Sequence, residues 1–113
     1  MRRSDLGEFE EVVLLSVAVH SPEAYSVVIA EELEQQTGRT VTTGAVHAAL
    51  QRLENKGMVT SQMGESTAER GGRRKRIFKV TVAGSRVLHE VKEVRDNLWS
   101  RVAPRALPKI KPT

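Results

Sequence analysis

The amino-acid sequence predicts an α+β fold that is mainly α. Three observations support this class. Apolar residues recur at helical spacing in three segments of the first half, two short strand-like segments flank a glycine-rich basic stretch, and a fourth helical pattern follows them. The predicted order is therefore helix, helix, helix, strand, strand, helix.

Length and composition indicate one globular domain. The chain has 113 residues, of which 39% are hydrophobic and 28% charged, enough for one core and too few for two. It contains no cysteine, which excludes disulfides, thiol catalysis and zinc bound by cysteine. No apolar run reaches the roughly 20 residues that span a bilayer, and no signal-peptide core follows the first residues. We therefore expect a cytoplasmic protein with no membrane partner.

Charge is distributed unevenly along the chain. Residues 1–37 carry two basic and eight acidic side chains, whereas residues 38–113 carry sixteen basic and six acidic ones. The two parts have net charges of −6 and +10, within a whole-chain charge of +4. This asymmetry suggests that one surface binds a polyanion, with nucleic acid as the first candidate.

The first two helices are predicted at 6–20 and 26–37. Apolar residues at helical spacing predict that the first helix is buried on more than half of its circumference. The Ser21-Pro22-Glu23 sequence breaks it, Ser26 is the expected N-cap of the second helix, and Gly38 ends that helix. The inward positions of the two helices are Leu6, Phe9, Val13, Val17, Tyr25, Ile29 and Leu33.

A third helix is predicted from Thr43 to about Lys56, with threonines at 40–43 available to cap it. Its core stripe is Val46, Leu50 and Leu53. Short strands are then predicted at 57–60 and 77–82, on either side of a flexible loop at 64–72. They can pair as a hairpin with a long tip.

A fourth helix is predicted at 82–102. Its apolar residues Val87, Val91, Val94 and Leu98 follow alternating steps of four and three, which is the spacing of a coiled-coil seam. Such a seam would be exposed on a small monomer, so we expect it to form a dimer interface. The segment 103–113 contains three prolines among basic residues and is predicted to be mobile.

Three helices followed by a two-stranded hairpin form the plan of a winged helix-turn-helix, in which the second and third helices are the helix-turn-helix. We assign residues 1–81 to this DNA-binding unit, 82–102 to a long dimerisation helix and 103–113 to a tail. The third helix would be the recognition helix, because small and polar residues lie opposite its core stripe. The predicted DNA-contacting residues of this helix are Thr42, Thr43, Gly44, His47, Ala48, Gln51 and Arg52.

The basic stretch from Glu69 to Lys79 is the second candidate DNA contact. Six cations oppose one acid over eleven residues, and a bound phosphate backbone would relieve their mutual repulsion. The wing residues predicted to bind DNA are Arg70, Arg73, Arg74, Lys75 and Arg76.

No catalytic or metal-binding pattern is found. The three histidines lack metal-ligand spacing, no P-loop or nucleophile elbow occurs, and Glu10-Glu11 and Glu31-Glu32 are interpreted as neighbouring solvated acids. The sequence therefore predicts neither an enzyme nor a cofactor. We interpret Trp99 as a residue that packs in the core or in a dimer interface, in preference to one that stacks on a ligand.

Three stretches of the chain resemble the PadR family of bacterial transcriptional regulators, in its short form with one C-terminal helix. They are Ala24–Leu33, Thr43–Val59 and Gly72–Gly84. The Leu-x-x-Leu-x-x-x-Gly ending of the second is common to many winged helices. Its combination with a basic strand and a Thr-x-x-Gly sequence is much more specific. The resemblance covers about 6–102, and family members commonly have tyrosine where this chain has His47.

The resemblance implies a homodimer, built through the C-terminal helix, that binds a palindromic operator in double-stranded DNA, usually as a repressor. Some short members bind aromatic drugs between the two C-terminal helices beside a tryptophan, and Trp99 lies in a comparable region. The alternative is a winged helix that docks a partner protein without reading DNA sequence. Only the DNA-binding hypothesis requires the cluster Arg70–Lys79.

Overall fold

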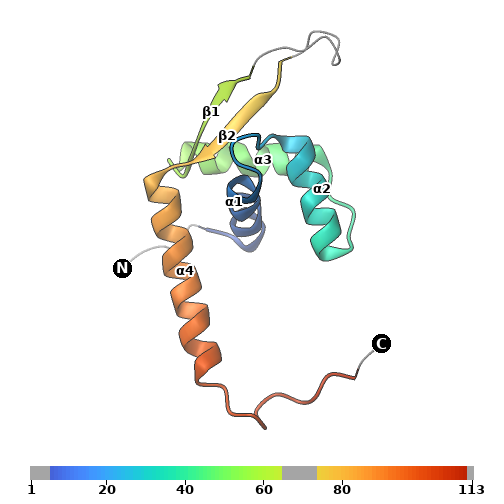
Figure 1. Cartoon of the computed structure of the whole chain (residues 1–113), viewed down its shortest axis with the longest axis vertical. Helices are drawn as coiled ribbons and strands as arrows, with labels where there is room; N and C mark the ends of the chain where they lie inside the picture. The colour runs from blue at the N-terminus through green and yellow to red at the C-terminus, as the bar shows by residue number, and fades with distance from the viewer. Residues whose placement is uncertain (1–5, 65–73, 112–113) are drawn as a thin grey trace.

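The computed structural model describes residues 6–64 and 74–111. Its elements are α1 (Glu8–His20), α2 (Ser26–Thr37), α3 (Thr43–Asn55), β1 (Val59–Met63), β2 (Arg76–Val80) and α4 (Val82–Ser100). The first three helices and the hairpin lie together, and α4 runs away from them as a separate arm (Figure 1). The predicted class and element order are therefore confirmed. No helix within 6–64 or 74–111 has the length and apolar character needed to cross a membrane.

Helices α1 and α2 begin differently from the prediction. Helix α1 begins at Glu8 because the extended residue Gly7 occupies the N-cap position. Helix α2 is preceded by Tyr25 as N-cap, so Ser26 is its first residue and not its cap. The cause is tertiary, since Phe78 of β2 donates its backbone N–H to Ala24 O at 2.8 Å and holds this segment in an extended conformation.

The turn between α2 and α3 is closed by local hydrogen bonds. Gly38 adopts φ 70° after α2, a left-handed conformation that is strained for other residues. Glu34 Oε2 then accepts the backbone N–H of Val41 at 2.8 Å. Thr42 Oγ1 accepts the N–H of Ala45 at 3.0 Å and caps α3, as predicted. These contacts fix the angle at which α3 leaves the turn.

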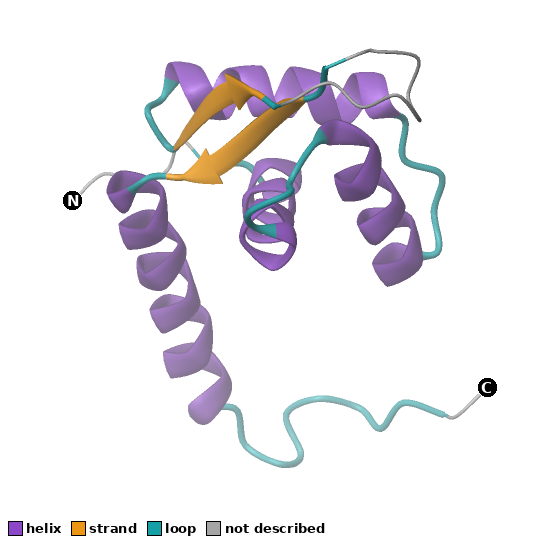
Figure 2. Cartoon of the chain, turned by 45° about the horizontal axis from the view of Figure 1, so that its top comes forward, coloured by secondary structure: helices purple, strands orange, loops and turns teal. Residues whose placement is uncertain are grey.

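The two strands pair antiparallel, with the first residue of β1 opposite the last residue of β2. Both strands differ from the predicted ranges. β1 starts later and extends further than 57–60, because polar residues on its outer face hide the strand pattern from the sequence. β2 ends before Thr81, because that residue caps the next helix. Figure 2 shows the hairpin beside α3.

One hydrophobic core joins α1, α2, α3 and the base of the hairpin. Its buried residues are Val13, Leu14, Val17, Ala24, Ile29, Ala30, Leu33, Val46, Ala49, Leu50, Leu53, Met58, Val59 and Phe78. The predicted inward stripes of α2 and α3 are therefore confirmed at every aliphatic position. The prediction for α1 was too broad, since Val12, Leu15 and Val19 remain exposed along one side of that helix.

Thr81 and Gly84 connect the hairpin to α4. Thr81 Oγ1 accepts the backbone N–H of Gly84 at 3.0 Å and donates its own proton to Gly57 O at 2.7 Å. Its backbone N–H donates to Met58 O at 3.0 Å. A Cβ atom at position 84 would lie only 2.3 Å from Met58 O, so glycine is required there by close backbone approach. The Thr-x-x-Gly sequence is thus a structural joint.

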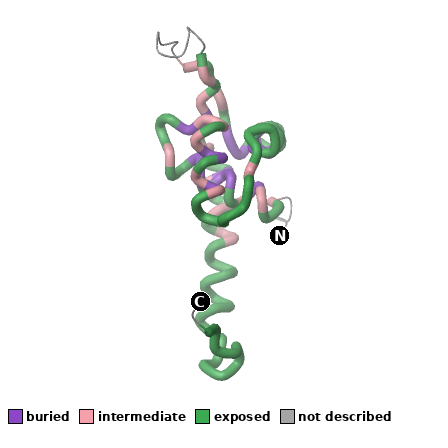
Figure 3. Tube along the Cα trace, turned by 90° about the vertical axis from the view of Figure 1, so that its right-hand side faces the viewer, coloured by how far each residue is buried: buried purple, intermediate pink, exposed green. Residues whose placement is uncertain are grey.

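Helix α4 is largely uncovered by the rest of the chain. Figure 3 shows exposed residues along most of its length, in contrast to the buried segments of the other helices. Val87 and Leu88 in its first turns contact the core. Further along, Leu98 is 60% exposed and Trp99 66% exposed. The described structure ends in an exposed segment after Arg101.

The close backbone approach at Gly84 predicts that one added methyl group lowers the stability of the fold strongly. Gly84→Ala should lower the free energy of unfolding by about 2–3 kcal/mol, because the new Cβ meets backbone atoms that cannot rotate away. Gly44→Ala is the matched control, since its Cβ would meet nothing within 4 Å in a helical position, and it should raise stability by up to about 1 kcal/mol. Urea unfolding of both variants measures the difference. Wild-type stability in Gly84→Ala would contradict the tight joint.

Candidate nucleic-acid interface

The outward face of α3 is the first part of the candidate interface. Gly44, Ala48, Gln51 and Asn55 are exposed and follow one another at steps of four, three and four, so they form one line along the helix. This line lies opposite the buried stripe of α3. The side chains near the N-terminal end are small, which allows the backbone to approach another surface closely. Gln51 is the first long hydrogen-bonding side chain on the line.

The structure places the remaining predicted helix residues around this line. Thr42 and Thr43 lie at the N-terminal end, where Thr42 is used as the cap. His47 is exposed beside the line. Asn55 was missed by the sequence reasoning, although its position eleven residues after Gly44 marks it as part of the same face. The face therefore offers a histidine, a glutamine and an asparagine as hydrogen-bonding groups.

Arg52 lies on the side of α3 that faces α1. Its Nε donates to Glu10 Oε2 at 2.7 Å, and Lys56 Nζ donates to Glu10 Oε1 at 2.7 Å. Glu10 is buried, with 9% of its side chain exposed. The interpretation of Glu10 as a solvated acid was therefore wrong, because the adjacent cations come from a helix 42 and 46 residues further along the chain.

Glu10 remains ionised in this setting. Burial by itself raises the pKa of the Glu10 carboxyl, but hydrogen bonds from Lys56, Arg52 and the Gly7 amide outweigh it and hold the pKa below its usual value. The charged carboxylate of Glu10 thus links the start of α1 to the end of α3.

Three of the predicted wing cations, Arg74, Lys75 and Arg76, lie within the described residues, and each makes a contact within the protein. Arg74 donates to the carbonyl of Gly64 at 2.8 Å, across the hairpin. Arg76 donates to Ser61 Oγ at 3.0 Å. The ammonium of Lys75 lies 3.8 Å from the centre of the Tyr25 ring. These contacts hold the three cations against the opposite strand and against Tyr25, which precedes α2. The predicted contacts Arg70 and Arg73 lie outside the described residues.

Arg39 is a further exposed cation that sequence reasoning did not select. It lies in the turn just before α3, where its backbone N–H donates to Thr37 Oγ1 at 3.2 Å. The signal was available in the sequence, because Arg39 is the only lysine or arginine between Arg3 and Arg52. It adds a positive charge near the N-terminal end of α3.

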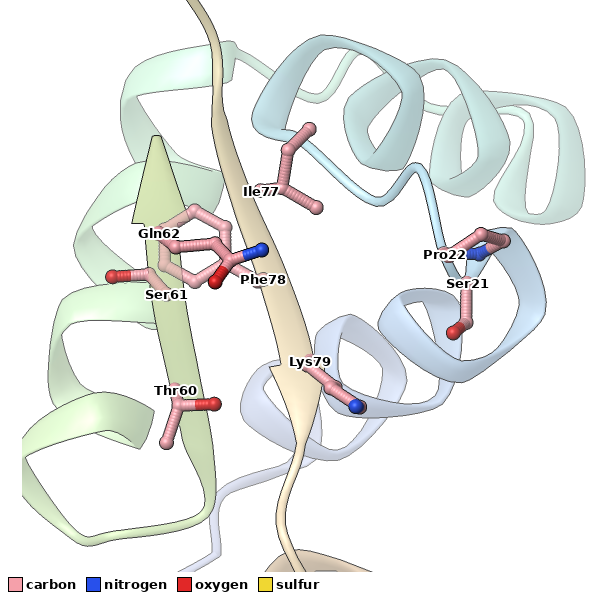
Figure 4. Close-up of a pocket in the computed structure, with 8 residues that line it drawn as sticks. All are labelled: Ser21, Pro22, Thr60, Ser61, Gln62, Ile77, Phe78 and Lys79. Carbon is pink, nitrogen blue, oxygen red and sulfur yellow. The ribbon is translucent and has the colours of Figure 1, made fainter. Parts of the chain in front are cut away.

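A hollow of about 310 Å³ lies on the other face of the hairpin, against the α1–α2 turn. Figure 4 shows Ser21 and Pro22 of the turn on one side and the strand residues Thr60 and Lys79 on the other. The register places Thr60 opposite Lys79 on this outer face. The hollow is therefore separated from the outward face of α3 by the sheet itself.

The predicted dimer seam lies on α4, which extends away from α1–α3 and the hairpin. Val87 and Val91 are partly covered, whereas Val94 and Leu98 are exposed. A separate groove of about 640 Å³ runs between α1 and α4, with Leu15 and Leu88 among its lining residues. Arg95 of α4 donates to Glu11 of α1 at 2.9 Å across this groove.

Exposed apolar residues are also found on α1. Leu15 is 44% exposed and lines the groove, and Val12 and Val19 are exposed on the same helix. Sequence reasoning assigned these residues to the core because helical periodicity cannot tell which neighbour covers a stripe. Trp99 comes eleven residues after Leu88, so it lies on the groove side of α4.

The described residues contain no arrangement that indicates metal chemistry. Within 6–64 and 74–111, no three histidine, cysteine, aspartate or glutamate side chains are grouped so that they could hold a metal ion. His20 bonds Glu32 at 3.0 Å, and His89 bonds the carbonyl of Ser85 at 2.8 Å. Both contacts are ordinary helix-surface interactions.

Comparison with known proteins supports this geometry. The profile of the transcriptional regulator PadR-like family matches residues 14–90. A PadR-like transcription factor from Bacteroides fragilis is 24% identical, with 83% of this chain and 85% of that chain covered and a TM-score of 0.67. A PadR-like transcriptional regulator from Bacillus cereus is 18% identical, with 83% and 86% covered and a TM-score of 0.68. A comparison with curated proteins gave no match.

The family match spans more than half of the chain and includes α2, α3, both strands and the joint at Thr81 and Gly84. The structural matches have the same winged-helix architecture, and the match to the Bacteroides fragilis protein extends over most of both chains. The chain therefore belongs to the PadR-like family of transcriptional regulators, which are DNA-binding proteins and not enzymes.

Proposed function

We propose that this regulator is a homodimeric repressor that binds a palindromic site in double-stranded DNA. The observation that carries the proposal is the outward line of α3. It presents small residues followed by Gln51 and has no acidic side chain, and helix α3 itself lies near the base of the hairpin (Figure 1). A surface of this kind fits the major groove of DNA.

In this proposal, α3 reads bases and the flanking cations hold the phosphate backbone. Gly44 and Ala48 allow the helix to approach the base edges, and Gln51 is long enough for a bidentate contact to adenine. His47 donates to a phosphate or a base in place of the tyrosine that is common in the family. Arg39 precedes α3, and Arg74, Lys75 and Arg76 belong to the hairpin; these cations would contact phosphates without reading sequence.

The dimer would form through the exposed apolar surface of α4 and α1. The seam Val87, Val91, Val94 and Leu98 is the predicted contact, and exposed Leu15 of α1 offers a second apolar position. A two-fold axis through this contact would present two copies of α3 to half-sites about 34 Å apart or a multiple of that distance. Such a dimer acts on chromosomal DNA in the cytoplasm.

A flat aromatic molecule is the proposed class of effector. Trp99 is 66% exposed on the side of α4 that faces the groove, so its ring is available for stacking. A ligand between the two α4 helices would change the distance between the recognition helices. Release from the operator would follow from that change.

The first prediction for DNA binding concerns salt dependence. If each subunit brings three or four cations to phosphates, a dimer makes about six to eight contacts, which gives a log–log salt slope of about −5 to −7. Titration of labelled duplex at several KCl concentrations measures this slope. A slope shallower than about −2, or equal affinity for single strands, would instead favour a winged helix that docks a protein.

A second prediction separates base reading from backbone contact. Gln51→Ala should lower the preference for the selected site by about 1–3 kcal/mol, because a bidentate base contact is lost. Arg39→Ala should weaken all duplexes by a similar factor, because phosphates are the same in every sequence. Selection from random duplexes, followed by titration, gives both quantities. If Arg39→Ala changed the base preference and Gln51→Ala did not, the roles of base reading and phosphate contact would be reversed.

The third prediction concerns the dimer. Val91→Glu combined with Leu98→Glu should give a folded monomer with much weaker operator binding, because charges cannot be buried in an apolar interface. Arg86→Glu combined with Asn97→Glu is the control, since these residues line a polar face of α4. Sedimentation and operator titration measure both effects. A double seam variant that stayed dimeric would place the interface on another surface.

A further inference from the structure

Two cations at the end of the recognition helix share one carboxylate of α1. Arg52 Nε and Lys56 Nζ each lie 2.7 Å from an oxygen of Glu10, and both donate to it. Because the two cations are four residues apart, they project from the same side of α3. Glu10 therefore contacts the last two turns of α3 from the side.

The position of this carboxylate is set by the core. Glu10 belongs to the first turns of α1, and the next turns of that helix contribute Val13, Leu14 and Val17, all fully buried. The Gly7 amide also donates to Glu10 Oε1, at 3.3 Å. The carboxylate thus has little freedom to follow Arg52 or Lys56 if they turn outward.

Arg52 is close enough to the outward line to contact DNA if it were released. It follows Gln51 by one residue, a rotation of about 100° around the helix axis. Its side chain is 51% exposed even while it is bonded to Glu10. A guanidinium in this position could turn toward a phosphate beside the groove. The fixed carboxylate competes with DNA phosphates for the same cation.

We propose that Glu10 is a positioning and specificity-determining residue, which keeps Arg52 and Lys56 away from the phosphate backbone. Rigid retention of two cations lowers sequence-independent attraction to DNA, while the residues from Gly44 to Gln51 remain free to read bases. This inference rests on the proposed function, because it requires α3 to face the duplex. The sequence analysis predicted that Arg52 contacts DNA. In this proposal Arg52 instead bonds Glu10 and does not read bases.

Glu10→Gln tests the proposal with little change in side-chain size. Loss of the negative charge should release the two cations, so that binding to a random-sequence duplex tightens about tenfold at low salt and the log–log salt slope steepens by about one to two per subunit. Operator affinity should rise by a smaller factor, so the ratio of specific to non-specific binding falls. Duplex titration over a range of KCl concentrations measures both.

Glu11→Gln is the matched control. It makes the same change of charge in the same turn of α1, but Glu11 bonds Arg95 of α4 and not the recognition helix. Its effect on non-specific affinity should stay within about twofold, since it releases no cation beside the duplex. Equal effects of the two substitutions would show that only net charge matters and would overturn the proposal.

Arg52→Ala provides a second, independent measurement. In the wild-type background it should change non-specific affinity by less than about twofold, and in the Glu10→Gln background it should remove about half of the gain, because Lys56 stays released. If Glu10→Gln fails to fold, Arg52→Ala alone decides: a small effect supports the proposal, and a tenfold loss with a shallower salt slope overturns it.

The failure of this inference can be distinguished from the failure of the proposed function. If the wild type binds duplex DNA and Glu10→Gln binds it equally well, this inference alone is overturned. If the wild type does not bind duplex DNA, the proposed function is overturned as well.

Discussion

The backbone approach between Gly84 and Met58 is the constraint on which the arrangement of this molecule depends. A Cβ at position 84 would lie 2.3 Å from Met58 O, so α4 can begin only where no side chain intervenes. Thr81 fixes the same point with three hydrogen bonds, to Gly57, Met58 and Gly84. Because this joint sets the direction of α4 relative to α3, it would also set the separation of two recognition helices in a dimer.

Charge is organised in three dimensions as well as along the chain. The acidic N-terminal part forms α1 and α2, while the outward line of α3 carries no acid. Glu10 shows the physical consequence, since one buried carboxylate pairs with two cations at the end of the helix proposed to contact DNA. A buried ion pair of this kind is weak evidence for extra stability, but it holds its partners in one geometry.

Much of the fold could be predicted because the signals are local. Helical spacing located four helices, the threonines at 40–43 predicted a cap for α3, and Gly38 marked the end of α2. Two of the errors share one cause, which is an influence from a distant part of the chain. Ser26 is not a cap because β2 pairs with Ala24, and Glu10 is not solvated because α3 supplies its partners. Neither partner can be identified from spacing within one element.

The sequence by itself determined the class of the fold, the order of its elements and most of the outward residues of the recognition helix. These follow from periodicity and from capping residues, which act over a few positions. Only the tertiary structure decided that Arg52 bonds Glu10, that Leu15 lies exposed beside α4, and that Gly84 must be glycine. Each of these depends on which surfaces meet when the helices pack. That choice is made by the whole core and not by any single segment.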